Sequence, residues 1–205
     1  MLRFSALAAL ALVATPAAAK DAVGLSPIGL PFGPDGPRRL PTDHVLTGAI
    51  VLDGADALPQ KMGSAKRDQF ATALSETLAQ LGMLATDPAK ARFRLTPVWV
   101  GLDSPFKISF KNRATVHMSW RLTRIDTGQT IFARQIDTSA ESSGGDASAR
   151  VRGIERIALM TNIASVAACL DKAAYGKAPT NCALTPGFTY RAPSPPMVIF
   201  VPRFR

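Results

Sequence analysis

The sequence predicts an α+β fold, a two-layer sandwich in which two helices pack on one face of a mostly antiparallel sheet. Three features indicate this fold: a long hairpin over residues 113–138, an amphipathic helix before it and a longer apolar helix after it. The chain order is strand, helix, strand, hairpin, helix. A crossover followed by a meander places both helices on the same face of the sheet.

Residues 113–125 alternate between apolar and polar side chains, which is typical of a half-buried strand. Four apolar side chains fall on one face: Val116, Met118, Trp120 and Leu122. Five polar side chains fall on the other: Thr115, His117, Ser119, Arg121 and Thr123. The Asp-Thr-Gly at 126–128 and the apolar-rich run over 129–138 complete a β-hairpin pattern.

Two elements are expected near the start of the domain. Residues 45–52 are a short β-prone run. A helix over 65–81 follows, with Ser64 as its N-cap and Gly82 just after its end. Its apolar stripe consists of Phe70, Leu74, Thr77, Leu78 and Leu81.

Residues 92–101 form a further strand that alternates in the same way. Phe93, Leu95 and Trp99 share one face, and the other face carries Arg92, Arg94 and Thr96. Pro97 cannot donate to a ladder, so this strand lies at an edge or carries a bulge there. Alternation continues over 102–111, and joining that run to the hairpin would make an unusually long strand. We therefore expect a turn or bulge near Asn112.

After the hairpin, residues 139–148 are rich in Ser and Gly and are expected to form a flexible loop. A helix over 149–173 follows. Two apolar rows along it indicate that much of its circumference is buried.

The N-terminus has a basic Arg3, a short apolar run and an Ala-Ala-Ala ending at Ala19. This is the pattern of a secretory signal peptide over residues 1–19, and a buried N-terminal helix is the alternative. The residue directly after the cleavage site is not a cysteine, so we expect no lipid anchor. Residues 20–44 are rich in Pro and Gly and are expected to form an extended arm, either disordered or docked on a partner.

The two cysteines, Cys169 and Cys182, predict a disulfide, because an exported protein meets an oxidising compartment. Two free thiols or a metal pair are alternatives that lack supporting ligands nearby. The bridge is worth about 3 kcal/mol on the chain-entropy argument. It would tie a Pro-rich tail over 176–205 to a domain over 45–175. Within the tail, residues 197–201 form an apolar segment suited to an edge strand, a core cover or a partner-docking strand.

The formal net charge of +9 indicates acidic partners. Outside the cytoplasm these are anionic lipid headgroups, lipopolysaccharide, wall polymers or acidic protein faces. No basic and aromatic nucleic-acid motif is present, so nucleic acid is not an expected partner. We expect contact with a membrane to be peripheral at most.

No catalytic, metal or cofactor site is predicted. The chain has two histidines, His44 and His117, without clustered carboxylates or thiolates for zinc. It contains no nucleophile elbow and no phosphate-binding glycine loop. The aspartates, Asp103 and Asp137 among them, are expected mainly in or near turns.

The candidate binding site is a basic strand face that carries Arg92, Arg94, His117 and Arg121. It is interpreted either as a solvated face or as a surface that binds an anion or a partner protein.

Four segments together resemble small envelope proteins of Gram-negative bacteria. They are the helix over 70–82, the Phe-Arg-Leu at 93–95, the hairpin over 120–129 and the Arg-Ile-Ala-Leu at 156–159. The group includes lipoprotein activators of peptidoglycan synthases, the periplasmic domain of the curli secretion channel and the N-terminal domain of the Tol translocation protein. The resemblance covers residues 45–173 and implies adaptors or assembly factors without active sites.

Together these features predict an exported, non-enzymatic accessory or adaptor protein of the periplasm that acts in cell-envelope assembly. A binding protein for an anionic glycan or lipid headgroup is the second hypothesis, and a small envelope hydrolase is the third.

Overall fold

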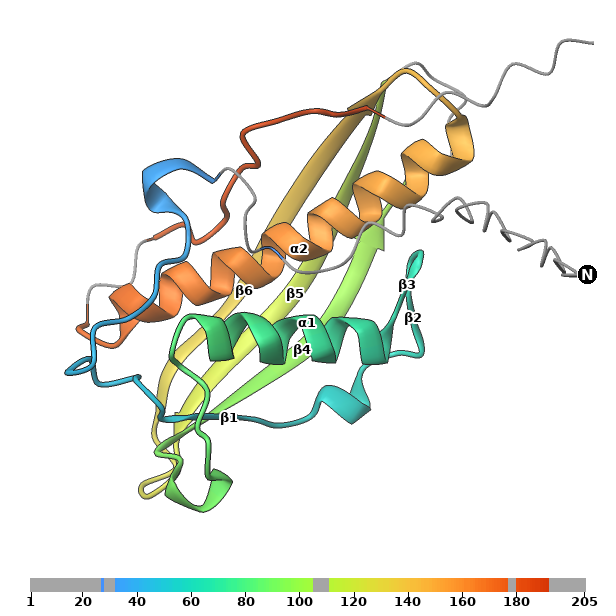
Figure 1. Cartoon of the computed structure of the whole chain (residues 1–205). Helices are drawn as coiled ribbons and strands as arrows, with labels where there is room; N and C mark the ends of the chain where they lie inside the picture. Colours follow the sequence, from blue (N-terminus) through green and yellow to red (C-terminus); the bar gives the residue numbers. More distant parts are fainter. Residues whose placement is uncertain (1–26, 28–31, 105–110, 177–179, 192–205) are drawn as a thin grey trace, which may run out of the picture.

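The computed structural model of the protein describes residues 27, 32–104, 111–176 and 180–191 (Figure 1). Its main sheet has five strands in the order β1-β4-β5-β6-β7. The long strands are antiparallel neighbours: β4 (Phe93–Asp103), β5 (Lys111–Arg124) and β6 (Thr130–Ser143). The outermost strands, β1 (Ile50–Leu52) and β7 (Tyr190–Arg191), run parallel to their neighbours. The predicted α+β class is therefore confirmed, in a mixed sheet whose long strands are antiparallel and whose short edge strands are parallel.

The central hairpin is confirmed in β5 and β6. The predicted apolar positions of β5 are all buried: Val116, Met118, Trp120 and Leu122. Gly128 in the turn has a φ of 68°, which glycine adopts without strain. β6 runs on to Ser143, so the loop expected over 139–148 is wrong. Ala140 and Ser142 are buried there and keep the two-residue period while they pair with β5.

Pro97 lies where β4 has a free edge. β1 pairs with β4 only from Phe93 to Leu95, so no described strand needs the missing N–H on that side. The bulge lies between Trp99 and Gly101 instead. The turn or bulge expected near Asn112 is not at this residue, which pairs in regular register with Ser142; residues 105–110 lie outside the described residues.

α1 (Arg67–Gln80) begins two residues later than expected. Ser64 is not its N-cap. The Lys66 N–H donates to the Gln69 side-chain oxygen at 3.2 Å, which closes the first turn of the helix. Gly82 follows the helix with a φ of 76°, as expected for a helix end.

Ser64 belongs to a two-stranded hairpin of β2 (Lys61–Met62) and β3 (Ala65–Lys66). Its backbone N–H donates to Glu155 Oε2 at 2.7 Å. This hydrogen bond ties the hairpin to the long second helix.

That helix, α2 (Ala147–Ala173), starts close to the expected position. Asp146 is its N-cap, and the hydrogen bonds from the Ser148 hydroxyl and the Ala149 N–H lower the pKa of that carboxyl. By length and composition α2 could cross a membrane, but 94% of its most apolar window is buried inside the fold. It is a core helix.

The two helices meet the sheet at Trp120. The indole Nε1 donates to Asn162 Oδ1 of α2 at 2.8 Å, and the ring lies 6.3 Å from the Phe70 ring of α1. The Asn162 amide nitrogen donates to the Ile136 carbonyl at 2.8 Å and to Thr138 Oγ1 at 3.1 Å. One buried amide therefore links α2 to both β5 and β6.

The domain begins before residue 45, inside the arm expected over 20–44. Leu40 is buried, and its N–H donates to the Leu81 carbonyl at 2.9 Å. His44 is also buried, with Nε2 3.1 Å from Asp171 Oδ1 at the end of α2. Tertiary contacts hold residues 40–44 against the core, outside any helix or strand.

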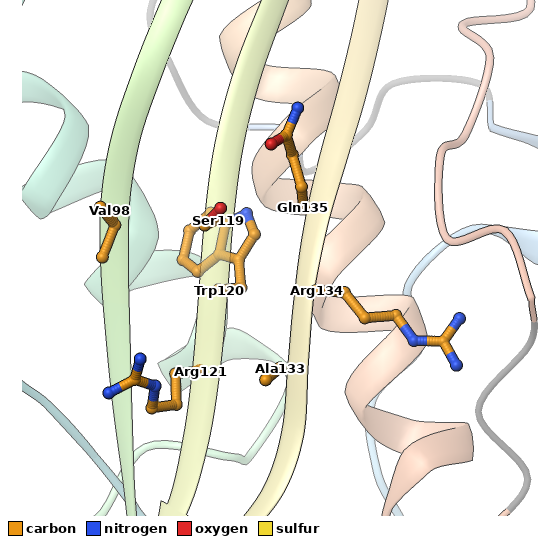
Figure 2. Close-up of a pocket in the computed structure, with 7 residues that line it drawn as sticks. All are labelled: Val98, Ser119, Trp120, Arg121, Ala133, Arg134 and Gln135. Atoms are coloured by element: carbon orange, nitrogen blue, oxygen red, sulfur yellow. The ribbon is translucent and has the colours of Figure 1, made fainter.

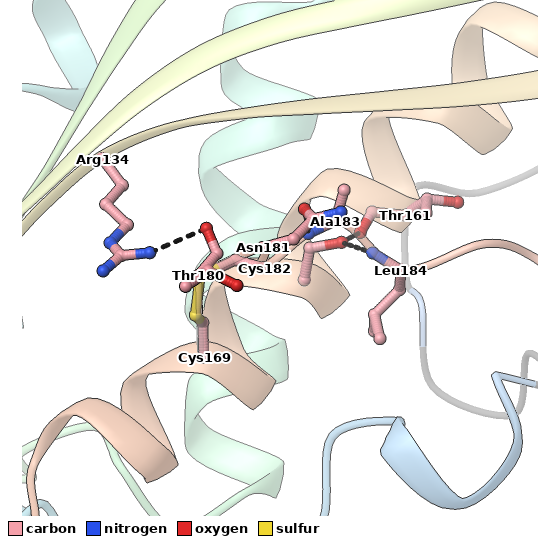
Figure 3. Close-up of a disulfide and its surroundings, with 9 residues drawn as sticks. Arg134, Thr161, Cys169, Thr180, Asn181, Cys182, Ala183 and Leu184 are labelled. Carbon is pink, nitrogen blue, oxygen red and sulfur yellow. Dashed lines mark hydrogen bonds between the residues drawn. A yellow bond between two sulfur atoms is a disulfide. The ribbon is translucent and has the colours of Figure 1, made fainter. Parts of the chain in front are cut away.

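The Cys169–Cys182 disulfide is confirmed, with the two Cα atoms 5.5 Å apart. It ties residues 180–191, the C-terminal strap, to α2 (Figure 3). Arg134 Nη1 donates to the Thr180 carbonyl at 2.9 Å, which holds the strap beside β6.

The strap ends in β7, where Tyr190 packs on Gly153 of α2 so closely that a Cβ at this glycine would overlap the ring. The expected signal peptide (1–19) and apolar tail segment (197–201) lie outside the described residues.

Candidate functional site

The candidate site is the outer face, defined as the face of β4, β5 and β6 opposite the two helices. No helix in the part of the chain that the structure describes covers it (Figure 1). Neighbouring strands place the following pairs side by side: Thr96 with Arg121, Ser119 with Gln135, and His117 with Asp137. These pairs form a continuous surface three strands wide.

Arg92 does not join the other predicted arginines on this face. Its Nη2 donates to the Val45 carbonyl at 2.6 Å, and its Cζ lies 5.9 Å from the centroid of the Phe93 ring. A backbone acceptor and a core aromatic ring therefore hold the guanidinium at the end of the strand.

Arg94 and Arg121 do lie on the outer face. Arg94 Nε is 3.6 Å from Asp53 Oδ2, an exposed ion pair worth about 1 kcal/mol at most. Arg121 is exposed and forms neither an ion pair nor a hydrogen bond with any described residue.

His117 bridges two carboxylates across the three long strands. Its Nδ1 is 2.9 Å from Asp137 Oδ1 on β6, and its Nε2 is 3.2 Å from Asp103 Oδ2 on β4. A neutral imidazole has one N–H, so only the imidazolium satisfies both contacts. The hydrogen bond to Asp137 is the main cause that raises the pKa of His117 above 6.5; burial opposes the rise, and Asp103 adds to it.

This bridge predicts a pH-dependent stability. The bridge stabilises the fold fully at pH values below the pKa that His117 has in the unfolded chain. Because the pKa of His117 is raised in the folded state, this stabilisation is lost as pH rises through that higher pKa. We expect His117→Gln to lower the free energy of unfolding by about 1 kcal/mol near pH 5.5. At about pH 9 the same substitution should lower the free energy of unfolding much less.

Urea unfolding of wild type and variant at both pH values measures this difference. Asp126→Asn is the control, since Asp126 lies outside the bridge and should not change the pH dependence. An equal cost of His117→Gln at both pH values would contradict a charged bridge.

Within the described residues, carboxylates match the Lys and Arg side chains of the outer face in number, so the face is less basic than in the sequence interpretation, and charged His117 adds one further positive group. Four Lys and Arg side chains lie on or beside it: Arg94, Lys111, Arg113 and Arg121. Four acidic side chains match them: Asp53, Asp103, Asp137 and Glu141. The expectation that the aspartates lie near turns is wrong for Asp137, which is in the middle of β6. Asp137 lies two residues after Gln135 and four after Ala133, so strand alternation places all three side chains on the same face.

A shallow hollow of about 280 Å³ lies on the outer face (Figure 2). Ser119 and Ala133 have short side chains, whereas their neighbours Val98, Arg121 and Gln135 are longer, and this difference creates the depression. Figure 2 shows that the Arg134 side chain, which also borders the hollow, points away from it.

The polar groups of the hollow keep unused hydrogen-bonding capacity. Gln135 Nε2 donates to Asp137 Oδ1 at 2.9 Å, which leaves the Gln135 side-chain oxygen as an acceptor. The Ser119 hydroxyl has no hydrogen-bond partner among the described residues. Together with Arg121, the hollow offers two donor groups and one acceptor.

Both histidine rings are engaged by neighbouring groups. Within the described ranges, no group of three or more His, Cys, Asp or Glu side chains is placed to hold a metal ion. His117 has both ring nitrogens on carboxylates. His44 accepts from the Leu46 N–H at Nδ1, 3.1 Å away, and turns Nε2 to Asp171. Neither ring presents a free nitrogen to activate a serine.

No protein-family profile and no curated protein matches the chain. Among solved structures, it is similar to a DUF330 protein of Xanthomonas campestris, with a TM-score of 0.45 and 14% identity. That match covers 54% of this chain and 63% of the other, so the chain spans less than two thirds of that protein.

Two further structures are similar at the same level. A candidate lipoprotein of Caulobacter crescentus has a TM-score of 0.46 and 15% identity, over 65% of this chain and 96% of the other. A minor lipoprotein of Acinetobacter baumannii has a TM-score of 0.44 and 12% identity, over 62% and 94%. None of the three is named as a member of the groups that the sequence resembles, and likeness this low carries no argument about function.

Proposed function

We propose that the protein is an exported, periplasmic accessory protein of the cell envelope that binds a partner protein through its outer face and catalyses no reaction. The observation that carries the proposal is the outer face itself. Three long paired strands hold a continuous, mainly polar surface that no described helix covers. Strand pairing fixes such a surface in advance, so a partner would meet a rigid face at low cost in conformational entropy.

The hydrolase hypothesis has little support from the geometry. A hydrolytic serine needs a base with a free ring nitrogen, and both nitrogens of His117 already face Asp103 and Asp137.

The second candidate, a binder of anionic glycan or lipid headgroups, is favoured by the net charge of +9. The four carboxylates on the described part of the outer face argue against it there, because they repel a polyanion.

The test is in-cell crosslinking followed by purification of the tagged full chain. Wild type is compared with an Arg94→Glu, Arg121→Glu double variant. The control double variant, Arg92→Glu with Arg124→Glu, makes the same charge change at the strand ends. We expect wild type and control to capture one stoichiometric envelope protein, and the outer-face variant to capture about tenfold less. Recovery of no protein, or of lipid or glycan alone, would overturn the accessory role in favour of the second candidate.

A further inference from the structure

Among the outer-face arginines, Arg121 is distinguished by its lack of a partner in the described part of the chain. Arg94 pairs with Asp53, and Arg113 Nη2 donates to Ser139 Oγ at 3.1 Å. On a face where carboxylates match the Lys and Arg side chains in number, Arg121 is therefore the place where an incoming negative group adds an ion pair without displacing an existing one.

We propose that the hollow beside Arg121 takes the side-chain carboxylate of an aspartate or glutamate on the partner protein. This inference rests on the proposed function and names the chemistry of the partner at the same face. The guanidinium of Arg121 matches a carboxylate with two parallel N–H···O bonds. Ser119 on the same strand face supplies a further hydroxyl donor.

The acceptor in the hollow favours a peptide over a simple anion. Gln135 Nε2 already donates to Asp137, and the Gln135 side-chain oxygen can accept a hydrogen bond from a donor on the ligand. Sulfate brings only acceptors to such a site. An acidic residue within a polypeptide brings a carboxylate for Arg121 together with a backbone N–H for Gln135.

The apolar border of the hollow fits the same occupant. Val98 is 49% exposed on β4, and Ala133 lies opposite Arg121 on β6. Both side chains can contact the methylene groups of a glutamate or aspartate, and apolar contact at this position would also exclude water from the ion pair.

The test titrates the isotope-labelled full secreted chain with N-acetyl-glutamate methylamide and follows the nuclear magnetic resonance signals of Arg121, Ser119 and Gln135. We expect a saturable shift at these three residues. The neutral N-acetyl-glutamine methylamide should give none. Inorganic sulfate, which has no donor group, should bind about tenfold more weakly.

Two variants and a control sharpen the result. Arg121→Glu should abolish the shift, and Arg121→Lys should weaken binding several-fold because it keeps the charge without the two parallel donors. Arg124→Glu, the same charge change at the end of the strand, should bind the capped glutamate as wild type does.

The inference is overturned by the absence of saturable shifts, or by sulfate binding as tightly as the capped glutamate, which would mark a general anion site. In cells, a single Arg121→Glu variant that still captures the partner would overturn this inference and leave the accessory role intact. If wild type captures no protein at all, the accessory role fails, whatever the titration shows.

Discussion

Replacing Asn162 by alanine is expected to lower the free energy of unfolding by about 3 kcal/mol. This one side chain accepts from the Trp120 indole and donates to the Ile136 carbonyl and the Thr138 hydroxyl. Thr138 keeps a second bond, to the Ala158 carbonyl at 2.8 Å. The main cost therefore comes from the indole N–H, which would be left buried without its acceptor.

A double-mutant cycle separates this hydrogen bond from the loss of packing. Trp120→Phe removes the indole N–H, so its cost should fall by about 1 kcal/mol or more when Asn162 is already alanine. Asn181→Ala is the matched control, because this exposed asparagine in the strap should change stability by less than about 0.5 kcal/mol. Urea unfolding measures the four proteins of the cycle and the control, and strictly additive costs of the two substitutions would contradict a coupled pair.

Local patterns in the sequence predict the strands and helices well where side-chain periodicity is unbroken. Trp120 falls on the buried face by simple alternation, and α2 is identified by its apolar rows. The network around Asn162 could not be predicted in the same way. A polar residue in an apolar helix gives no sign of which backbone carbonyl or indole it will meet, since that depends on how α2 crosses β5 and β6.

In the candidate site, too, periodicity predicts which face a residue lies on but not which residues it contacts. Alternation correctly puts His117 and Arg121 on the polar face. The carboxylates beside His117 come from the register of three strands, which brings Asp103 and Asp137 to either side of one imidazole. Without that register, the face looks basic, although carboxylates match its Lys and Arg side chains in number within the described residues.

Composition was misleading in two segments where tertiary contacts outweigh local preference. Residues 139–143 are mostly small and polar, as in a loop, yet pairing with β5 keeps them in the sheet. Leu40 and His44 sit among prolines and glycines, yet both are buried against the ends of the helices. Neither the strand pairing of residues 139–143 nor the burial of Leu40 and His44 produces a periodic pattern in the sequence.

Removing the disulfide, by Cys169→Ala together with Cys182→Ala, should lower the free energy of unfolding by about 3 kcal/mol. The bridge joins residues 13 apart in the sequence and restricts the unfolded chain accordingly. Alanine is preferred to serine because Cys169 is buried, and a hydroxyl there would add the cost of an unpaired polar group. For a domain of this size the loss corresponds to a melting temperature about 6 to 12 °C lower.

The same variant tests how the strap is held. Without the disulfide, few attachments remain near its start, among them the hydrogen bond from the Leu184 N–H to Ser165 Oγ at 3.0 Å (Figure 3). We expect limited proteolysis to cut residues 180–191 faster in the variant, and chemically reduced wild type to behave like the variant. Faster cutting with an unchanged urea midpoint would contradict the entropic account, because the bridge would then act on the strap alone and not on the unfolded chain.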